Sequence, residues 1–170
     1  MKDKISKEIQ NSLDVEHKKA TQKEIIDYFV KKTKVDAPTS MIENYLFHVI
    51  EDIKSKNNNN QSIDEENLKN AYKDTAESSV KWYLIKEHIL NVAEINVSND
   101  DYENRKKELI EKDPQNAKSI KVFLKDSNNQ QKFVDDILNE KLFEYLKQYA
   151  IIKIDEKKSD ELRKMQGASQ

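Results

Sequence analysis

Residues 25–46 read IIDYFVKKTKVDAPTSMIENYL, and this stretch decides the fold. Apolar residues before and within it recur on an every-fourth ladder, as they do on one face of a helix. They are Ile5, Ile9, Leu13, Ile25 and Phe29, with His17 and Thr21 interrupting the series. A residue before proline is pushed out of the helical region, so the helix ends before Pro38, which can itself open the next helix. We therefore expect two long helices, at residues 2–32 and 39–56, that meet at an angle.

The composition favours long helices joined by few connections. The chain has 170 residues with one Gly and two Pro, whereas sheet proteins of this size need many turns that use both residues heavily. Charged and apolar residues each make up 36% of the chain, and the mean hydropathy is −0.96. Because this apolar supply is thin for a compact sphere, we expect a helical body with much exposed surface, or a fragment of a larger protein.

Charge and cysteine content exclude several classes of partner and site. The net charge is −2 and acids alternate with bases, so there is no strong basic field for nucleic acid. We see no uncharged apolar run long enough to cross a membrane, and no secretory signal. The absence of Cys excludes a disulfide scaffold and agrees with a cytoplasmic location. Met1 is compatible with a native start and with the start of an expressed fragment, of which we favour the fragment.

A third long helix is expected to run to about Val92. It follows the polar connector at residues 57–61 and begins with a capping-box pattern, Ser62 at the cap and Glu65 three residues later. Its apolar stripe comprises Leu68, Tyr72, Ala76, Val80, Leu84 and His88, widened by Trp82, Tyr83, Ile85 and Ile89. A widened stripe indicates contact with more than one neighbouring helix.

Cap and breaker residues divide the remainder of the chain. Residues 94–97 read as an extended connector, residues 98–101 as a second cap before a short helix, and Asp113-Pro114 as its end. We expect a short helix or turn over residues 117–124. Residues 128–131 precede a last long helix to about Tyr149, residues 150–154 resemble a strand, and a charged tail follows.

Most residues that enzymes need are missing. Phosphate binding needs a Gly-rich loop, but the one glycine is Gly167 in the tail. His17, His48 and His88 lie far apart in sequence and form no His-Glu-x-x-His zinc motif. The acids alternate with lysines, as on solvated helix faces with local ion pairs, and no carboxylate pair stands out. We therefore expect no enzyme activity, no metal site and no cofactor.

Several segments, taken in order, resemble the C-terminal domain of bacterial trigger factor. In that family a long helix ends in an apolar pair before a β-branched residue, Asp, a small residue and Pro, as VDAP does at residues 35–38. VKWYLI at residues 80–85 resembles the family's apolar strip, and EINVS at residues 94–98, followed by Asp101, its next connector. AIIKIDEK at residues 150–157 resembles its final extended segment. The likeness spans most of the chain.

This resemblance implies an all-α fold, with an elongated multi-helix body and helical arms, as in SurA-like chaperones. It assigns residues 1–157 to the helical chaperone domain and residues 158–170 to a charged, flexible tail. The implied function is that of an ATP-independent cytoplasmic chaperone module that binds apolar segments of unfolded or nascent polypeptides. The family's Gly-Phe-Arg-x-Gly ribosome-binding loop and its prolyl isomerase domain are not in this sequence, so the ribosome is implied as a partner only through a missing domain.

Client binding needs apolar patches separated by polar surface on a frame that stays open. Met and aromatic side chains suit such promiscuous contacts because they adapt to many shapes. The candidate client-binding residues are Met41, Tyr45, Phe47, Trp82, Tyr83 and Phe123. Core burial is the favoured interpretation of Val80, Leu84, Ile137 and Leu138, which lie on helical stripes. For Met41, Tyr45, Phe47 and Phe123, core and client contact stay equally open.

The alternative function is that of a structural helical interaction or oligomerisation protein without client binding. A coiled coil of this kind predicts an even heptad seam and one self-complementary patch. The irregular stripes and the breaks at Pro38 and Asp113-Pro114 count against it. Whether the chain forms a weak homodimer, and which clients it binds, stay open at this point.

Overall fold

The computed structural model describes residues 2–56 and 64–150, with side chains from residue 9 onward. Every regular element in these ranges is helical, which confirms the predicted fold class. The elements are α1 (Lys2–Lys32), α2 (Thr39–Lys56), α3 (Glu65–Val92), α4 (Asn99–Lys112), the 3-10 turn η1 (Pro114–Asn116), α5 (Ala117–Phe123) and α6 (Ser127–Lys147). The predicted connector at residues 57–61, the strand-like residues 151–154 and the charged tail lie outside the described residues.

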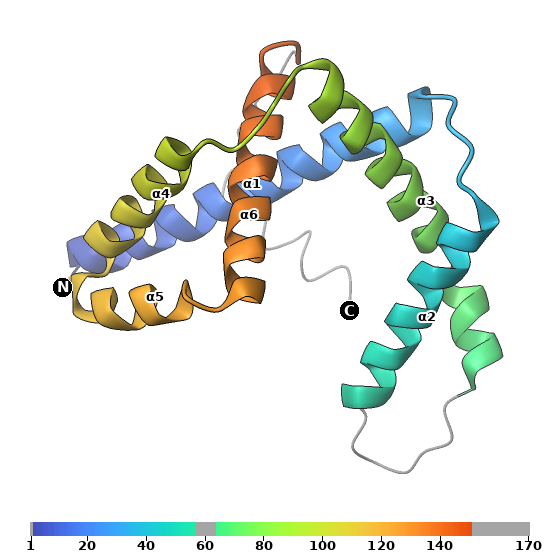
Figure 1. The fold of residues 1–170 in the computed structure, drawn as a ribbon, viewed down its shortest axis with the longest axis horizontal. Helices are drawn as coiled ribbons and strands as arrows, with labels where there is room; N and C mark the ends of the chain where they lie inside the picture. Colours follow the sequence, from blue (N-terminus) through green and yellow to red (C-terminus); the bar gives the residue numbers. More distant parts are fainter. Residues whose placement is uncertain (1, 57–63, 151–170) are drawn as a thin grey trace.

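The helices form an open arch with two projections (Figure 1). On one side, α2 and the first half of α3 run antiparallel; we call this pair the α2–α3 projection. On the other side, α4, α5 and the first half of α6 form the α4–α6 projection. The long α1 crosses between the two sides, and the second halves of α3 and α6 reach it there. The chain is therefore an elongated helical body with arms, as the resemblance implied.

The break between α1 and α2 falls where the sequence predicts it. The Thr33 N–H donates to the Phe29 carbonyl at 2.9 Å, and no helix is present over residues 33–38. The Pro38 carbonyl accepts from the N–H groups of Met41 and Ile42, at 3.0 and 3.2 Å. Since the cap residue's carbonyl accepts the first bond of a helix, Pro38 is the N-cap of α2, one residue earlier than the opening position expected for it.

Two helix starts differ from the prediction because aspartates provide the caps. The Asp64 carboxylate accepts from the N–H groups of the second and third residues of α3, at 3.1 Å each, so Asp64 is the cap; the predicted cap Ser62 lies outside the described residues. Asp126 does the same for α6. The polar residues 128–131 consequently form the first turn of α6 instead of preceding it. At α4 the prediction is confirmed, because Ser98 and Asp101 exchange the two bonds of a capping box.

The junction between α3 and α4 is a Schellman motif with a residue that is unusual at this position. The Ile95 N–H donates to the Leu90 carbonyl at 3.0 Å, and the Glu94 N–H to the Asn91 carbonyl at 3.3 Å. Ile95 packs against the apolar cluster that contains Leu90, in keeping with the apolar contact that accompanies the motif. Glu94 occupies the left-handed position with φ of 52°, where glycine is usual.

Replacing Glu94 with glycine is expected to stabilise the fold by about 1 kcal/mol, because glycine has no Cβ to strain at positive φ. Urea unfolding followed by far-UV circular dichroism measures the change. Glu94→Ala is the matched control, since it removes the carboxylate but keeps the Cβ, and it should give no such gain. Equal stabilisation by both substitutions would show that the Glu94 carboxylate, rather than the positive φ of its backbone, destabilises the fold.

The main apolar cluster, the hub, joins α1, α3 and α6. Its buried members are Leu90, Leu142, Phe143 and Leu146, against which Ile25, Ile26, Phe29, Trp82, Ile89, Ile95, Leu138 and Tyr145 pack. Farther toward its N-terminus, α3 instead buries Ala76 and Val80 in the α2–α3 projection, where α2 buries Leu46 and Ile50. The widened stripe of α3 therefore serves two neighbours in succession, as predicted. The predicted core position Ile137 is buried, and Leu84 and Leu138 are half-buried.

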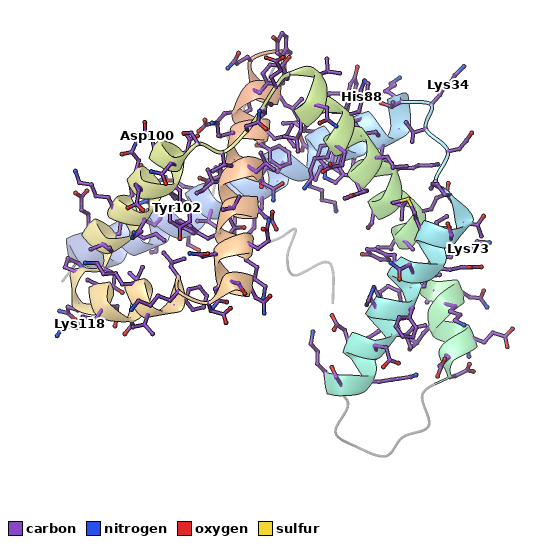
Figure 2. All side chains as sticks on the ribbon, viewed as in Figure 1. Lys34, Lys73, His88, Asp100, Tyr102 and Lys118 are labelled. Carbon is purple, nitrogen blue, oxygen red and sulfur yellow. The ribbon has the colours of Figure 1, made fainter. Side chains whose placement is uncertain are left out.

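A second cluster holds the α4–α6 projection together. Leu124, Phe133 and Ile137 are buried there, and Val97, Tyr102, Leu109 and Ile120 pack against them. The rings of Tyr102 and Phe133 meet edge to face at 5.1 Å between centroids, a favourable aromatic geometry. Figure 2 labels Tyr102 between α4 and α6. The projection is thus a small packed unit built on the first half of α6.

Three consecutive residues of α6 make polar bonds, some to α1 and α3 and others to α4 within the projection itself. Asn139 accepts from Lys86 of α3 at 3.4 Å. Glu140 accepts from Lys18 of α1 at 2.8 Å and from Arg105 of α4 at 3.1 Å. Lys141 donates to the Asn96 carbonyl and to the Asp101 carboxylate, both at 2.7 Å. One turn of α6 therefore contacts α1, α3 and the start of α4.

The ion pair of Asp101 with Lys141 makes stability depend on pH in the acid range. The Lys141 ammonium and the Ser98 N–H and hydroxyl hold the pKa of Asp101 at about 2. A lowered carboxylate pKa stabilises the fold above the unfolded value of about 4, and this contribution is lost as the pH falls toward 2. Asp101→Asn should therefore destabilise the chain at pH 7, and its deficit should shrink between about pH 4 and pH 2. Urea unfolding of the unchanged chain and of Asp101→Asn, at pH 7 and between about pH 4 and pH 2, measures the deficit in stability. A deficit that does not change with pH would contradict the prediction.

Candidate functional site

Three of the six candidate client residues lie on α2, and they differ in exposure. Met41 and Tyr45 are half-buried, and the Tyr45 hydroxyl accepts a hydrogen bond from the Ser79 hydroxyl of α3 at 3.3 Å. Phe47 is 58% exposed and its ring lies against that of His48. Tyr45 therefore contributes to the contact between α2 and α3, whereas Phe47 offers an aromatic face to solvent.

Two further candidates are neighbours on α3 with opposite environments. Trp82 stacks on Phe143 with 6.1 Å between ring centroids, and a tilted Phe29 ring lies 6.5 Å away. These contacts place the partly buried Trp82 in the hub, where its ring already has two aromatic partners within the fold. Tyr83, one residue later, is half exposed.

The sixth candidate, Phe123, lies on an apolar pocket in the α4–α6 projection. The pocket has a volume of about 360 Å³ and is lined by Leu109, Ser119, Ile120, Phe123, Leu124 and Phe133. Leu124 and Phe133 are buried, while Phe123 is 57% exposed. We call this feature the α5 pocket, because four of its six lining residues come from α5 and the turn that follows it.

Local hydrogen bonds fix the turn that forms the α5 pocket. The Leu124 N–H donates to the Ile120 carbonyl at 3.0 Å and ends α5. Asp126 then caps α6, and the side-chain amide of Asn129 donates back to the Phe123 carbonyl at 3.1 Å. The backbone of Phe123 is therefore tied to α6, while its ring remains accessible.

The lining of the α5 pocket suits binding rather than catalysis. Ser119 supplies its one polar side chain, and none of the six lining residues carries an acid or a base. Such a pocket can accept an apolar side chain by removing it from water, at about 25 cal/mol per Å² of buried apolar area. Sequence reasoning identified Phe123 as a candidate but missed Leu109, Ser119, Ile120, Leu124 and Phe133, which come together only when α4, α5 and α6 fold back on one another.

A second depression, of about 330 Å³, lies between the α3–α4 junction and the end of α6. Lys141 lines this depression, but its ammonium group already donates hydrogen bonds to the Asn96 carbonyl and the Asp101 carboxylate. No three or more His, Cys, Asp or Glu residues are placed to hold a metal within the described ranges. None of the helices seen there has the length and apolarity to span a membrane.

The arch and its two projections can now be compared with known proteins. The family described as bacterial trigger factor protein C-terminus matches residues 1–148. This chain belongs to that family. The trigger factor of Geobacter metallireducens is 24% identical over 138 residues, which cover 77% of this chain and 32% of the relative. The trigger factor of Salinibacter ruber is 25% identical over 146 residues, covering 84% of this chain and 32% of the relative.

The match to trigger factor is thus a match to part of it, since the chain spans about a third of the length of these two relatives. No solved structure matches the chain significantly. Membership in the trigger factor C-terminal family accords with the all-α arch and with the order of the segments at residues 35–38, 80–85 and 94–98.

Proposed function

We propose that this trigger factor C-terminal domain binds exposed apolar segments of unfolded or nascent polypeptides and keeps them from aggregating. It acts in the cytoplasm without ATP, by reversible binding and without a chemical step. The observation that supports this most is the α5 pocket, an apolar surface with the exposed ring of Phe123 on it. The proposal assigns no prolyl isomerisation and no ribosome contact to these residues.

The distribution of exposed apolar side chains agrees with this proposal. Phe47 on the α2–α3 projection and Phe123 on the α4–α6 projection are each more than half exposed. Their helices, α2 and α5, lie on opposite arms of the arch (Figure 1), in a chain of which 36% of the residues are charged. Scattered apolar contacts of this kind suit segments of many sequences better than one folded partner.

Suppression of aggregation tests the proposal. A denatured enzyme that aggregates on dilution is followed by light scattering, with the purified chain at several-fold molar excess and without ATP. We expect the scattering to fall in proportion to the chain added. Phe123→Ser should weaken client binding about fivefold, the loss expected for about 1 kcal/mol of apolar contact.

Val15→Ser is the matched control, because Val15 is 52% exposed but lies on α1 and does not line the α5 pocket. It should suppress aggregation as the unchanged chain does. Unaltered aggregation at several-fold excess would overturn the proposed function. Loss of suppression in Val15→Ser but not in Phe123→Ser would overturn the assignment of the site. A stable oligomer in sedimentation, in which Phe47 and Phe123 are protected from solvent, would favour the alternative function, a structural interaction protein.

A further inference from the structure

One side chain ties the end of α5 to the start of α6. The side-chain amide of Asn129 donates to the Phe123 carbonyl at 3.1 Å, across the short turn that joins the two helices (Figure 1). Since the last carbonyls of a helix have no partner within it, Asn129 supplies the partner that the Phe123 carbonyl needs. Asn129 is half-buried, whereas residues 125–128 and 130–132 on either side are exposed. We call this hydrogen bond the α5–α6 tie.

The first turn of α6 holds Asn129 in place independently of the tie. The Asn129 backbone N–H donates to the Asp126 carboxylate at 3.1 Å, as part of the cap of α6. Asn129 precedes Phe133 by four residues, so both side chains lie on the same face of the helix. Phe133 is buried and lines the α5 pocket. Asn129 therefore belongs to the face of α6 that carries the pocket.

The tie matters because packing alone does not hold the ring of Phe123. The next residue, Leu124, is buried and lines the pocket, so its contacts fix its side chain. The ring of Phe123 is 57% exposed, and the rotamers open to it depend on its backbone torsions. A side chain that is already ordered loses less entropy when a ligand binds to it. Holding the Phe123 backbone therefore prepares its ring for contact.

We propose that Asn129 is a positioning residue for client binding. Through the α5–α6 tie it orders Phe123 at the edge of the α5 pocket before a client segment binds. The inference rests on the proposed function and adds a residue that acts through Phe123 without touching the client. Loss of the tie should therefore lower the affinity for clients, and only when the ring of Phe123 is present.

Binding of a short fluorescent peptide to the full chain tests the inference. The peptide carries a central Leu-Phe pair flanked by Gln and Ser, so that no ion pair contributes, and fluorescence anisotropy measures its dissociation constant. Asn129→Ala removes the side-chain amide but keeps the backbone N–H that Asp126 caps. We expect this variant to raise the dissociation constant about threefold, less than the loss of about fivefold expected for Phe123→Ser.

Asn129→Asp separates positioning from folding. An ionised carboxylate has no N–H to donate to the Phe123 carbonyl, so the tie is lost, while a negative charge in the first turn of a helix is favourable. This variant should keep its melting temperature, measured by circular dichroism, and yet bind the peptide about threefold more weakly. Gln131→Ala is the matched control, because its exposed side-chain amide donates to Asp135 within α6, at 3.0 Å. It should leave the affinity unchanged.

A double variant shows whether Asn129 acts through Phe123. Adding Asn129→Ala to Phe123→Ser should weaken binding no further, because the ring that the tie orders is gone. A residue that merely stabilised the projection would weaken binding by the same factor with and without the ring, and this result would overturn the inference. An unchanged affinity in both Asn129 variants, or an equal loss in Gln131→Ala, would overturn it as well.

The same measurements keep this inference apart from the proposed function. If Phe123→Ser weakens peptide binding and the Asn129 variants do not, the proposed function stands and this inference alone fails. If the unchanged chain binds no peptide, the inference fails. The proposed function fails with it only when the chain also leaves the aggregation of a denatured enzyme unaltered.

Discussion

Replacing Leu142 with alanine should lower the free energy of unfolding by about 3 kcal/mol. Leu142 has no exposed surface and is surrounded by the hub, which joins α1, α3 and α6. Truncation removes its apolar contacts and leaves a cavity that helices from three parts of the chain must line. A small domain has only about 5–15 kcal/mol of stability, so this one change takes a large share of it.

Urea unfolding measures the Leu142→Ala effect, with far-UV circular dichroism as one probe and the fluorescence of the single tryptophan, Trp82, as the other. Because Trp82 packs in the hub, its signal reports directly on that cluster. Val92→Ala is the control, since Val92 is 70% exposed and its truncation should change stability by less than about 0.5 kcal/mol. Comparable losses from both substitutions would mean that the hub does not hold the arch together.

Replacing Trp82 with alanine should also be strongly destabilising, by about 3 kcal/mol. The indole ring stacks on Phe143 and touches the Phe29 ring, so its removal separates two aromatic partners on different helices. Trp82→Phe keeps an aromatic ring at the centre of this set and should cost less than about 1.5 kcal/mol. Thermal unfolding followed by circular dichroism compares the three chains.

The Trp82 variants also distinguish a role of Trp82 in the core from a role in client binding. If Trp82 serves only the hub, folded Trp82→Phe protein suppresses aggregation as well as the unchanged chain does. A normal melting temperature combined with lost suppression would instead identify Trp82 as a client-binding residue, as the sequence had allowed. Phe123→Ser makes the opposite comparison, because its exposed ring contributes little to folding.

The helices were predictable from local features of the sequence. Pro38 and Asp113-Pro114 interrupt a helix through the restricted geometry of proline itself. Ser98 and Asp101 form the cap of α4 within four residues. The caps at Asp64 and Asp126 were missed because Ser62 and the polar run at residues 128–131 carry equally strong local signals. Which residue caps a helix depends on where its first turn meets neighbouring elements, and this information is not local.

The candidate site was predicted less completely for the same reason. Phe123 could be singled out because it ends a short helix, where apolar residues are often exposed. The pocket beside it needs Leu109 of α4 and Phe133 of α6, residues that look like ordinary stripe positions in the sequence. Trp82 and Tyr83 were indistinguishable in sequence, and only the position of α6 separates the partly buried ring of Trp82 from the exposed ring of Tyr83.

The order in which the hub is made has a consequence for biosynthesis. The α2–α3 projection joins two helices that follow each other in the chain, so it can assemble as soon as both have left the ribosome. The hub residues of α1, by contrast, pack against a cluster that includes Leu142, Phe143 and Leu146 of α6, the last of the described helices to be translated. Until α6 emerges, Ile25, Ile26 and Phe29 lack these partners and have only the α3 residues of the hub to pack against. A domain that we propose protects unfinished chains would itself pass through an unfinished stage of this kind.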